Sequence, residues 1–399
     1  MSGHNTSEPA FSRPLHVGAP NVPSRARFLE LVDQVLDANW LTNDGPLVRE
    51  LETSIAAHLG LRHCVLVCNG TVALEIAARC LGLQGEVIIP SLTFVATAGA
   101  LEWLGIKPVF CDVDPRTYCI DPAEIERLVT PKTTAILGVH LFGRPCDADA
   151  LTRIAERHGL TLLFDAAHAF GCSAGGRMIG GLGACEVFSF HATKFFNTIE
   201  GGAVTTNDPD LAHRVRLARN FGFENGSVRA LGINGKMNEV CAAMGLSNLE
   251  ALQTVVECNR RNYGIYREGL SDLPGIRLME YDDSEKNNYQ YVVAEVLPEF
   301  GQTRDQLVES LHRDNVLARS YFAPGCHAVE PFCSDPACNP ELPHTLGLCE
   351  RLVTFPTGTR VSVEDVLKIT ALVRAAGPEH SRSDGDGDHE AARPKARAR

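Results

Sequence analysis

Seven short runs of β-branched and other apolar residues alternate with segments of helical periodicity in this chain of 399 residues. The runs lie at residues 63–69, 86–90, 108–113, 135–140, 161–165, 186–191 and 202–207. Most are separated by stretches such as 71–82 and 149–159, whose apolar residues recur at the spacing of one helix face. Apolar strands that alternate with helices are typical of a mainly parallel sheet covered on both faces. The pattern therefore predicts an α/β fold.

Polar residues follow several of these predicted strands. Asn69, Gly70 and Thr71 come directly after the first run. Asp165 ends the fifth run, and residues 189–194 close the sixth. In open α/β sheets, ligands bind at the carboxyl ends of the strands. These polar residues are therefore the first indication of a functional site.

The pattern changes in the C-terminal part of the chain. Residues 237–270 predict one long helix, broken or bent near Gly245. A strand at 288–296 and helices at about 303–314 and 362–376 then indicate a smaller α+β region. We expect two domains between polar termini. The expected segments are a disordered N-terminus at 1–12, a large domain at 13–255, a small domain at 256–376 and a disordered tail at 377–399.

Charge and cysteine content narrow the class of protein. A formal net charge of -12 argues against nucleic acid or an anionic membrane surface as the main partner. The start of the chain lacks the pattern of a signal peptide, and no uninterrupted apolar run is long enough to span a bilayer. The 14 cysteines lie mostly inside apolar runs, as expected for reduced core residues. These features predict a cytoplasmic enzyme.

No metal site is expected. Cys326, Cys333 and Cys338, with His327 nearby, form the nearest approach to a metal cluster. No CxxC pair occurs there, which disfavours zinc.

Lys194 is one of only seven lysines, and it lies in "FSFHATKFFNTIEGGAVTTND", between a predicted strand and an aromatic pair. One interpretation is a surface lysine whose apolar stem packs at the strand end. The other is a buried amine, whose pKa is lowered by desolvation so that some neutral nucleophile exists near pH 7. Such lysines form Schiff bases with carbonyl compounds and with pyridoxal phosphate.

Pyridoxal phosphate makes further demands, and the sequence offers a residue for each. Gly70 and Thr71, at the start of a predicted helix, offer backbone and hydroxyl donors for a phosphate, although an ordinary strand-to-helix turn has the same pattern. Asp165 suits the pyridine nitrogen, although it could be a helix N-cap. Phe94 could stack on the ring or be a core residue, and Ser189 could bind the phosphate or be an internally satisfied hydroxyl.

Several separated blocks together resemble the DegT/DnrJ/EryC1/StrS sugar aminotransferases. The blocks are NWLTNDGPLVRELE, VCNGTVALEIAARCLGL, PSLTFVATAGAL, FDAAHAFG, SFHATKFFNTIEGGAVTTND and GKMNEVCAAMGL. The similarity extends from about residue 15 to 375. It implies the fold-type-I aminotransferase architecture, with a seven-stranded mostly parallel sheet and a smaller C-terminal domain. It also implies a homodimer with active sites at the subunit interface.

The resemblance assigns a role to each candidate residue. It implies that Lys194 is the Schiff-base lysine and proton shuttle, and that Asp165 pairs with the pyridine nitrogen. His168 would lie near the ring hydroxyl, although it could also be a core histidine. The implied ring and phosphate contacts are Phe94, Gly70, Thr71, Ser189 and, from the neighbouring subunit, Asn234. Asn234 lies in GINGKM, where the family more often has GYNYRM, so the aromatic of that motif is absent here.

The resemblance also implies the reaction. Because the lysine is retained, an amino group would pass from an amino acid, L-glutamate by analogy, to a nucleotide sugar, with pyridoxamine phosphate as the aminated form of the cofactor. The most similar group acts on dTDP-4-dehydro-6-deoxy-D-glucose and makes dTDP-4-amino-4,6-dideoxy-D-glucose for antibiotic or polysaccharide sugars. The candidate sugar or phosphate contacts are Arg319, Tyr321, His327 and Lys236, the last from across the interface.

Three alternatives remain open from the sequence. The alternative most similar to a 4-aminotransferase is a 3-ketosugar aminotransferase. A nicotinamide-dependent oxidoreductase would need a GxGxxG turn after a strand, which CNGTVALEI does not supply. A non-catalytic regulatory homologue would have no need of Lys194, Asp165 and His168 together.

Overall fold

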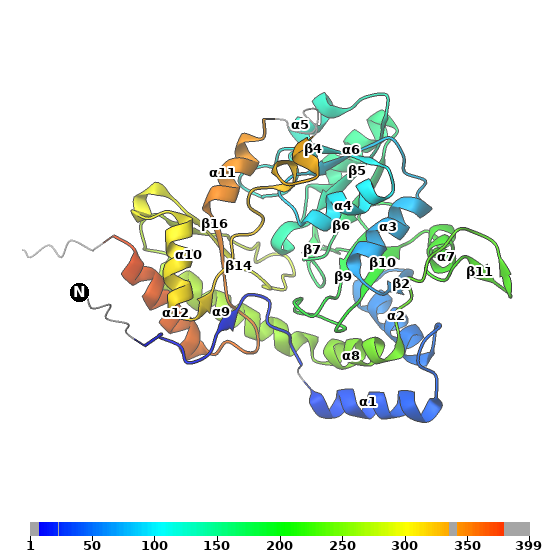
Figure 1. Ribbon diagram of the computed structural model, residues 1–399, viewed down its shortest axis with the longest axis horizontal. Helices are drawn as coiled ribbons and strands as arrows, with labels where there is room; N and C mark the ends of the chain where they lie inside the picture. Colours follow the sequence, from blue (N-terminus) through cyan, green and yellow to red (C-terminus); the bar gives the residue numbers. More distant parts are fainter. Residues whose placement is uncertain (1–7, 23, 335–340, 379–399) are drawn as a thin grey trace, which may run out of the picture.

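A central sheet of seven strands, in the order β2-β10-β9-β6-β5-β3-β4, organises the molecule (Figure 1). The structure is a computed structural model and describes residues 8–22, 24–334 and 341–378. The strands are β2 (His63–Val67), β3 (Glu86–Pro90), β4 (Lys107–Cys111), β5 (Thr133–Val139), β6 (Thr161–Asp165), β9 (Glu186–Ser189) and β10 (Gly202–Thr206). Strand β10 is antiparallel to both neighbours, while the pairs β4-β3, β3-β5, β5-β6 and β6-β9 are parallel. The seven predicted strands and the mainly parallel sheet are confirmed.

Helices cover both faces of this sheet, because successive strand residues point to opposite sides. Val187 packs in the apolar cluster that contains α3, and the next residue, Phe188, packs in the cluster that contains α2 and α8. The helices on the first side are α3 (Gly70–Cys80), α4 (Val95–Trp103) and α7 (Pro209–Ala218). Those on the second side include α2 (Pro46–Leu59) and α8 (Glu239–Glu250), with α1 (Arg25–Ala38) against α8. Helix α6 (Ala148–His158) packs against β5 and β6.

The C-terminal region has a three-stranded antiparallel sheet of its own (Figure 1). Its strands are β13 (Ile276–Leu278), β14 (Val292–Val296) and β16 (Leu352–Phe355). The surrounding helices are α9 (Leu252–Leu270), α10 (Arg304–Arg313), α11 (Pro343–Arg351) and α12 (Val363–Ala376). Outside these two sheets, β1 (Leu15–His16) pairs with β15 (Val316–Leu317). Two hairpins are formed by β7 (Ser173–Ala174) with β8 (Arg177–Met178) and by β11 (Phe223–Glu224) with β12 (Ser227–Val228). The short helix α5 (Pro122–Ile125) and several 3-10 turns complete the described chain.

The predicted long helix at 237–270 is two helices, and its break is not at Gly245. Helices α8 and α9 meet at Ala251, whose φ of -99° and ψ of 5° interrupt the helical backbone. Gly245 lies inside α8, where a Cβ would come within 2.4 Å of Leu51 Cδ2. The glycine therefore lets α2 approach α8 closely, and the expected bend near it was wrong.

The expectation of a disordered segment at 1–12 also needs correction. Residues 1–7 lie outside the described residues, but Phe11 is buried, and the Ala10 amide donates to Asp314 Oδ1 at 2.9 Å. The start of the described chain is thus anchored to the C-terminal region. The expected tail at 377–399 lies almost entirely outside the described residues.

The division into domains at 13–255 and 256–376 stays a prediction. The proposed boundary falls inside α9, and one continuous apolar cluster contains both Ile88 of β3 and Val292 of β14. In the described ranges, no helix combines the length and apolarity that crossing a membrane requires. The same ranges contain no grouping of three or more His, Cys, Asp or Glu side chains that could hold a metal ion.

Candidate active site

A cavity of about 600 Å³ lies beside the carboxyl ends of β2, β6 and β9. Nine of the twelve residues that the sequence analysis proposed for the site line it. They are Gly70, Thr71, Phe94, Asp165, His168, Ser189, Lys194, Arg319 and Tyr321. These nine residues come from five separate segments of the chain, and they meet near strand ends, as the rule for open parallel sheets predicts.

Lys194 is held in this cavity by a turn that is anchored on both sides. Its amide donates to the His191 carbonyl at 2.8 Å. The next two residues, Phe195 and Phe196, are buried, and the ring of Phe196 stacks on Phe170 at a centroid distance of 4.4 Å. Aromatic burial therefore fixes the position of the backbone from which the lysine side chain enters the cavity.

Burial also adjusts the chemistry of this amine. Desolvation lowers the pKa of Lys194 from 10.5 to about 8, and the Asp165 carboxylate opposes the shift by favouring the charged form. A fraction of the amine is consequently neutral near physiological pH. Lys194 is half-buried at the cavity, and its desolvation favours the nucleophile over the solvated surface lysine that the sequence left as an alternative.

Asp165 is buried at the end of β6 with both carboxylate oxygens in hydrogen bonds. Oδ1 accepts from the Ala167 amide at 3.0 Å, and Oδ2 accepts from the Thr97 hydroxyl at 2.9 Å. Desolvation raises the pKa of this carboxyl, and the Ala167 amide, the Thr97 hydroxyl and Lys194 counteract the increase. Within the described part of the chain, no cationic group forms an ion pair with Asp165 inside 4.0 Å. The carboxylate thus suits a cationic ligand atom that enters the cavity.

The start of α3 forms a cradle for an anion. The Asn69 side chain caps the helix by accepting from the Val72 amide at 2.8 Å. A Cβ on Gly70 would lie 2.9 Å from Ser189 Cβ, and a Cβ on Gly202 would lie 2.7 Å from the Asn69 carbonyl carbon. Glycine at both positions therefore lets β9, β10 and the helix N-terminus converge. The positive end of the helix dipole and the Thr71 and Ser189 hydroxyls then suit a phosphate.

His168 presents one defined donor to the cavity. Its Nδ1 accepts from the Phe142 amide at 3.2 Å, which leaves Nε2 as the protonated nitrogen of the neutral ring. Burial lowers the pKa of His168 well below its usual value, with Lys194 acting in the same direction. The ring is thus a neutral hydrogen-bond donor.

Phe94 precedes α4 and keeps an exposed ring at the cavity, with 57% of its surface accessible. Core phenylalanines are rarely this exposed, so the placement argues against the core alternative. An aromatic face left open to a cavity suits a planar ring as its stacking partner.

Arg319 and Tyr321 lie side by side at the rim of the cavity. The Arg319 guanidinium contacts the Tyr321 hydroxyl at 3.4 Å and lies 5.9 Å from its ring centroid. His327 does not reach the cavity. It is buried, with Nδ1 2.6 Å from Ser91 Oγ, and its amide donates to the same oxygen. His327 therefore fixes a turn against the end of β3, and its predicted contact with substrate was wrong.

Asn234 and Lys236 lie outside the lining of the cavity in their own chain. The Lys236 amine donates to Asn234 Oδ1 at 2.7 Å and lies 4.6 Å from the Phe221 ring centroid. Their predicted contribution to the site of a neighbouring subunit is compatible with the exposed position of Asn234 and stays a prediction.

Several lining residues were not singled out from the sequence. Tyr291 lies 4.6 Å from the His168 ring, and Phe322 lies 6.2 Å from Phe94, both measured between ring centroids. His191 and Glu200 also line the cavity, with Nε2 and Oε1 3.5 Å apart. Tyr291 lies in an apolar run, where an aromatic residue is usually core, so nothing in the sequence marked it. Phe322 adjoins Tyr321, and that neighbour was the one signal that could have indicated it.

The residues present fit pyridoxal phosphate in four independent respects. They provide an amine of lowered pKa, a buried carboxylate without a cationic partner among the described residues, an open aromatic face and a helix N-terminus with two hydroxyls. This site and the surrounding fold define a pyridoxal-phosphate-dependent aminotransferase.

Comparison with known proteins identifies the family. The model of the DegT/DnrJ/EryC1/StrS aminotransferase family matches residues 24–374, so the chain belongs to that family. The structure superposes on that of DesI, determined in the presence of its TDP-sugar product, with a TM-score of 0.89 and 50% sequence identity over 92% of this chain and 94% of that chain. The predicted fold class, the aminotransferase activity and the cofactor are confirmed.

Two curated relatives indicate the kind of substrate that such proteins use. A dTDP-4-amino-4,6-dideoxy-D-glucose transaminase of Shigella dysenteriae is 39% identical over 315 residues, which is 79% of this chain and 86% of the relative. A GDP-perosamine synthase of Caulobacter vibrioides is 35% identical over 325 residues, which is 80% of this chain and 86% of the relative. Both names refer to amino sugars linked to nucleotides.

Proposed function

We propose that this protein transfers the amino group of L-glutamate to the 4-keto carbon of dTDP-4-dehydro-6-deoxy-D-glucose. The product is dTDP-4-amino-4,6-dideoxy-D-glucose, a precursor of deoxyaminosugars. The observation that supports the proposal most is the convergence of Lys194, Asp165 and His168 in one cavity of a chain that is half identical to DesI. The name of the Shigella relative supports the position of the amino group.

The residues of the cavity have separate roles in the proposed reaction. Pyridoxal phosphate, when bound, supplies an electron sink for the carbanion that forms when a carbon next to nitrogen loses its proton. Lys194 Nζ takes the proton from the donor α-carbon, and in the second half-reaction it delivers a proton to C-4 of the sugar. The negative charge of Asp165 would lie next to the pyridine nitrogen of the cofactor and would keep that nitrogen protonated. Gly70, Thr71 and Ser189 would bind the phosphate of the cofactor.

An absorption titration tests this function. Protein reconstituted with pyridoxal phosphate should show the long-wavelength band of a lysine-linked cofactor, and Lys194→Ala should not. Glutamate should remove the band, and the dTDP-linked 4-ketosugar should restore it. Restoration by a 3-ketosugar alone would show that the protein is a 3-ketosugar aminotransferase. Restoration by a GDP-linked 4-ketosugar alone would show that the substrate carries GDP in place of dTDP. If glutamate leaves the band unchanged while another amino acid removes it, the proposed donor is wrong.

We also propose that the working unit is a homodimer in which each subunit supplies Asn234 and Lys236 to its partner. The segment around these residues exposes apolar side chains that a monomer would leave in water. They are Phe221, Phe223, Val228, Leu231 and Ile233, each at least 43% accessible. Clustered exposed apolar residues are typical of subunit interfaces. The cytoplasmic location stays a prediction.

Subunit mixing tests the shared site. Lys194→Ala and Asn234→Ala should each be inactive or strongly impaired alone. If the two subunits exchange, a mixed dimer has one intact site, and an equimolar mixture should recover up to about a quarter of wild-type activity. A mixture that stays as inactive as its components, although exchange is demonstrated by mass, would place Asn234 outside the partner's site.

A further inference from the structure

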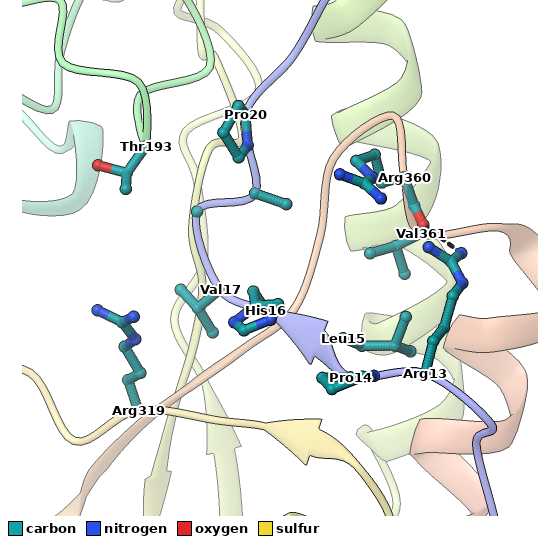
Figure 2. Close-up of a pocket in the computed structure, with 12 residues that line it drawn as sticks. Arg13, Pro14, Leu15, His16, Val17, Pro20, Thr193, Arg319, Arg360 and Val361 are labelled. Atoms are coloured by element: carbon teal, nitrogen blue, oxygen red, sulfur yellow. Dashed lines mark hydrogen bonds between the residues drawn. The ribbon is translucent and has the colours of Figure 1, made fainter. Parts of the chain in front are cut away.

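The turn that presents Lys194 is held by segments that lie far from it in the sequence. In Figure 2, residues 13–20 run past Thr193, the residue that precedes Lys194. Asn21 follows this segment, and its Nδ2 donates to the Phe195 carbonyl at 3.0 Å. The N-terminal segment therefore anchors the turn on the carboxyl side of the lysine.

The Gln290 side chain reaches the same turn from the C-terminal region. Its Oε1 accepts from the Phe195 amide at 3.2 Å, although the two residues are 95 positions apart in the chain. Gln290 is buried, and its own amide donates to Asn288 Oδ1 at 3.0 Å. The acceptor for the Phe195 amide is thus presented by a residue that is itself anchored.

The hydrogen bond to Gln290 acts on the backbone geometry of the lysine. The Phe195 N–H and the Lys194 carbonyl belong to one planar peptide group, which follows the Lys194 α-carbon. The peptide group before this α-carbon is held by the bond from the Lys194 amide to the His191 carbonyl at 2.8 Å. Because both peptide groups are held, φ and ψ of Lys194 are fixed, and with them the direction in which its side chain leaves the backbone.

The other half of the Gln290 amide has no comparable bond. Because Oε1 accepts from an N–H group, Nε2 is the donor, and it is buried without a hydrogen-bond partner in the described part of the chain. A buried unpaired donor costs free energy, which offsets much of the gain from the bond to Phe195. The net contribution of Gln290 to stability is therefore small, whereas its effect on the turn is direct.

We propose that Gln290 is a positioning residue for Lys194, which holds the peptide group after the lysine and thereby directs the amine into the catalytic cavity. The inference rests on the role proposed for Lys194. Gln290 does not line the cavity, so it acts through the Phe195 backbone and not by contact with a substrate. Displacement of a reacting group by about 1 Å can cost on the order of 100-fold in rate, so a bond of small net stability can still control catalysis.

Gln290→Met tests the proposal, because methionine has a similar length and lacks the acceptor. The melting temperature should stay within about 3 °C of wild type, since one unpaired donor, Nε2, is replaced by another, the Phe195 amide. Hydrogen exchange resolved to single amides should show the Phe195 amide exchanging at least about tenfold faster, with the amides of β6 unchanged. The value of kcat should fall by about tenfold or more, while KM for glutamate and for the ketosugar changes by less than about twofold.

Two further variants complete this test. Gln253→Met is the matched control, because Gln253 is an exposed glutamine of α9 outside the cavity. Gln290→Glu keeps an oxygen acceptor at the same reach and removes the unpaired donor, so its Phe195 exchange and kcat should be close to wild type. Wild-type kcat in Gln290→Met despite faster Phe195 exchange would overturn the proposal. So would a Gln290→Glu protein that is as slow as Gln290→Met although its Phe195 amide is protected.

Attachment of pyridoxal phosphate to cofactor-free protein separates this inference from the proposed function. In Gln290→Met, the rate should fall at every pH while the midpoint near 8 is kept, because the position of the amine changes and its surroundings do not. A shifted midpoint with an unchanged maximal rate would mean that Gln290 acts on the pKa of the amine, which would overturn the positioning role. If Lys194→Ala still shows the band of a lysine-linked cofactor, the role proposed for Lys194 fails, whatever the Gln290 variants show.

Discussion

Two regions of the molecule use aromatic residues in opposite ways. The segment that presents Lys194 is followed by Phe195 and Phe196, which are 5% and 1% accessible. The segment that presents Asn234 and Lys236 contains Phe221, which is 45% accessible and lies against the Lys236 amine. In the first region, burial in the same chain has already fixed the functional side chain. In the second, the apolar surface is exposed in the single chain, and the proposed dimer would cover it.

This contrast indicates which half of the site is complete in one subunit. The cofactor lysine, its carboxylate and the phosphate cradle depend on the core of the chain that contains them. The proposed contribution of Asn234 and Lys236 depends on association. Changes in the first region should therefore act on catalysis and on stability of the fold, whereas changes in the second should act through the dimer.

The largest effect is expected for Lys194→Ala. Loss of the amine removes both the covalent attachment and the proton transfer, so kcat should fall by at least about 10²–10⁴-fold. Lys132→Ala is the control, since Lys132 is exposed and outside the cavity. Steady-state rates at saturating glutamate and sugar measure kcat of both variants. A Lys194→Ala enzyme with a rate near that of the control would show that the amine is dispensable.

The next largest effect separates the two regions directly. Phe196→Ala should lower the free energy of unfolding by about 3–5 kcal/mol, because it opens a cavity beside Phe170 and Phe190. Phe221→Ala should change the stability of the subunit by less than about 0.5 kcal/mol and should instead raise the dimer dissociation constant. Urea unfolding measures the first quantity, and a dilution series in the ultracentrifuge measures the second. Equal losses of unfolding free energy in both variants would contradict the comparison.

A smaller effect is expected from Asp165→Asn. The amide can keep one hydrogen bond to Thr97 or Ala167 but loses the negative charge that a cationic ring nitrogen needs. The value of kcat/KM should fall by about 10²–10³-fold. Thr97→Val, which removes a hydrogen bond to Asp165 and keeps the charge, should cost about tenfold or less. If the two variants are equally impaired, orientation of the carboxylate matters more than its charge.

The most subtle expectation concerns pH. Only the neutral Lys194 amine can attack the cofactor aldehyde, so in cofactor-free protein the rate of attachment should rise with pH around a midpoint near 8. Because Asp165 favours the charged amine, Asp165→Asn should move this midpoint lower. Stopped-flow absorbance from pH 6 to 10, with Lys194→Ala as the blank, measures it. A midpoint close to the ordinary value of 10.5 would show that the amine stays solvated.

Local patterns in the sequence were sufficient for much of this protein. Seven strands, the polar residues at their ends and the roles suggested for Lys194, Asp165 and Gly70 follow from short-range patterns together with a family resemblance. Two expectations failed where long-range packing decides. Gly245 was interpreted as a bend because glycine weakens helices, but its lack of a side chain serves the approach of α2. His327 was interpreted as a ligand contact because of the family resemblance, but its ring is buried against Ser91.

The sequence by itself determined the fold class, because the alternation of strands and helices is a property of local segments, and its resemblance to a family supplied the expected chemistry. Only the tertiary structure decided which residues share a cavity. Phe94, Tyr291 and Phe322 come from distant segments. Packing places the rings of Tyr291 and Phe322 against His168 and leaves the ring of Phe94, which contacts Phe322, exposed. The hydrogen bond from the Phe195 amide to Gln290 is likewise a contact between segments that are far apart in the chain. Such long-range contacts depend on how complete surfaces fit together, and no short stretch of sequence encodes that fit.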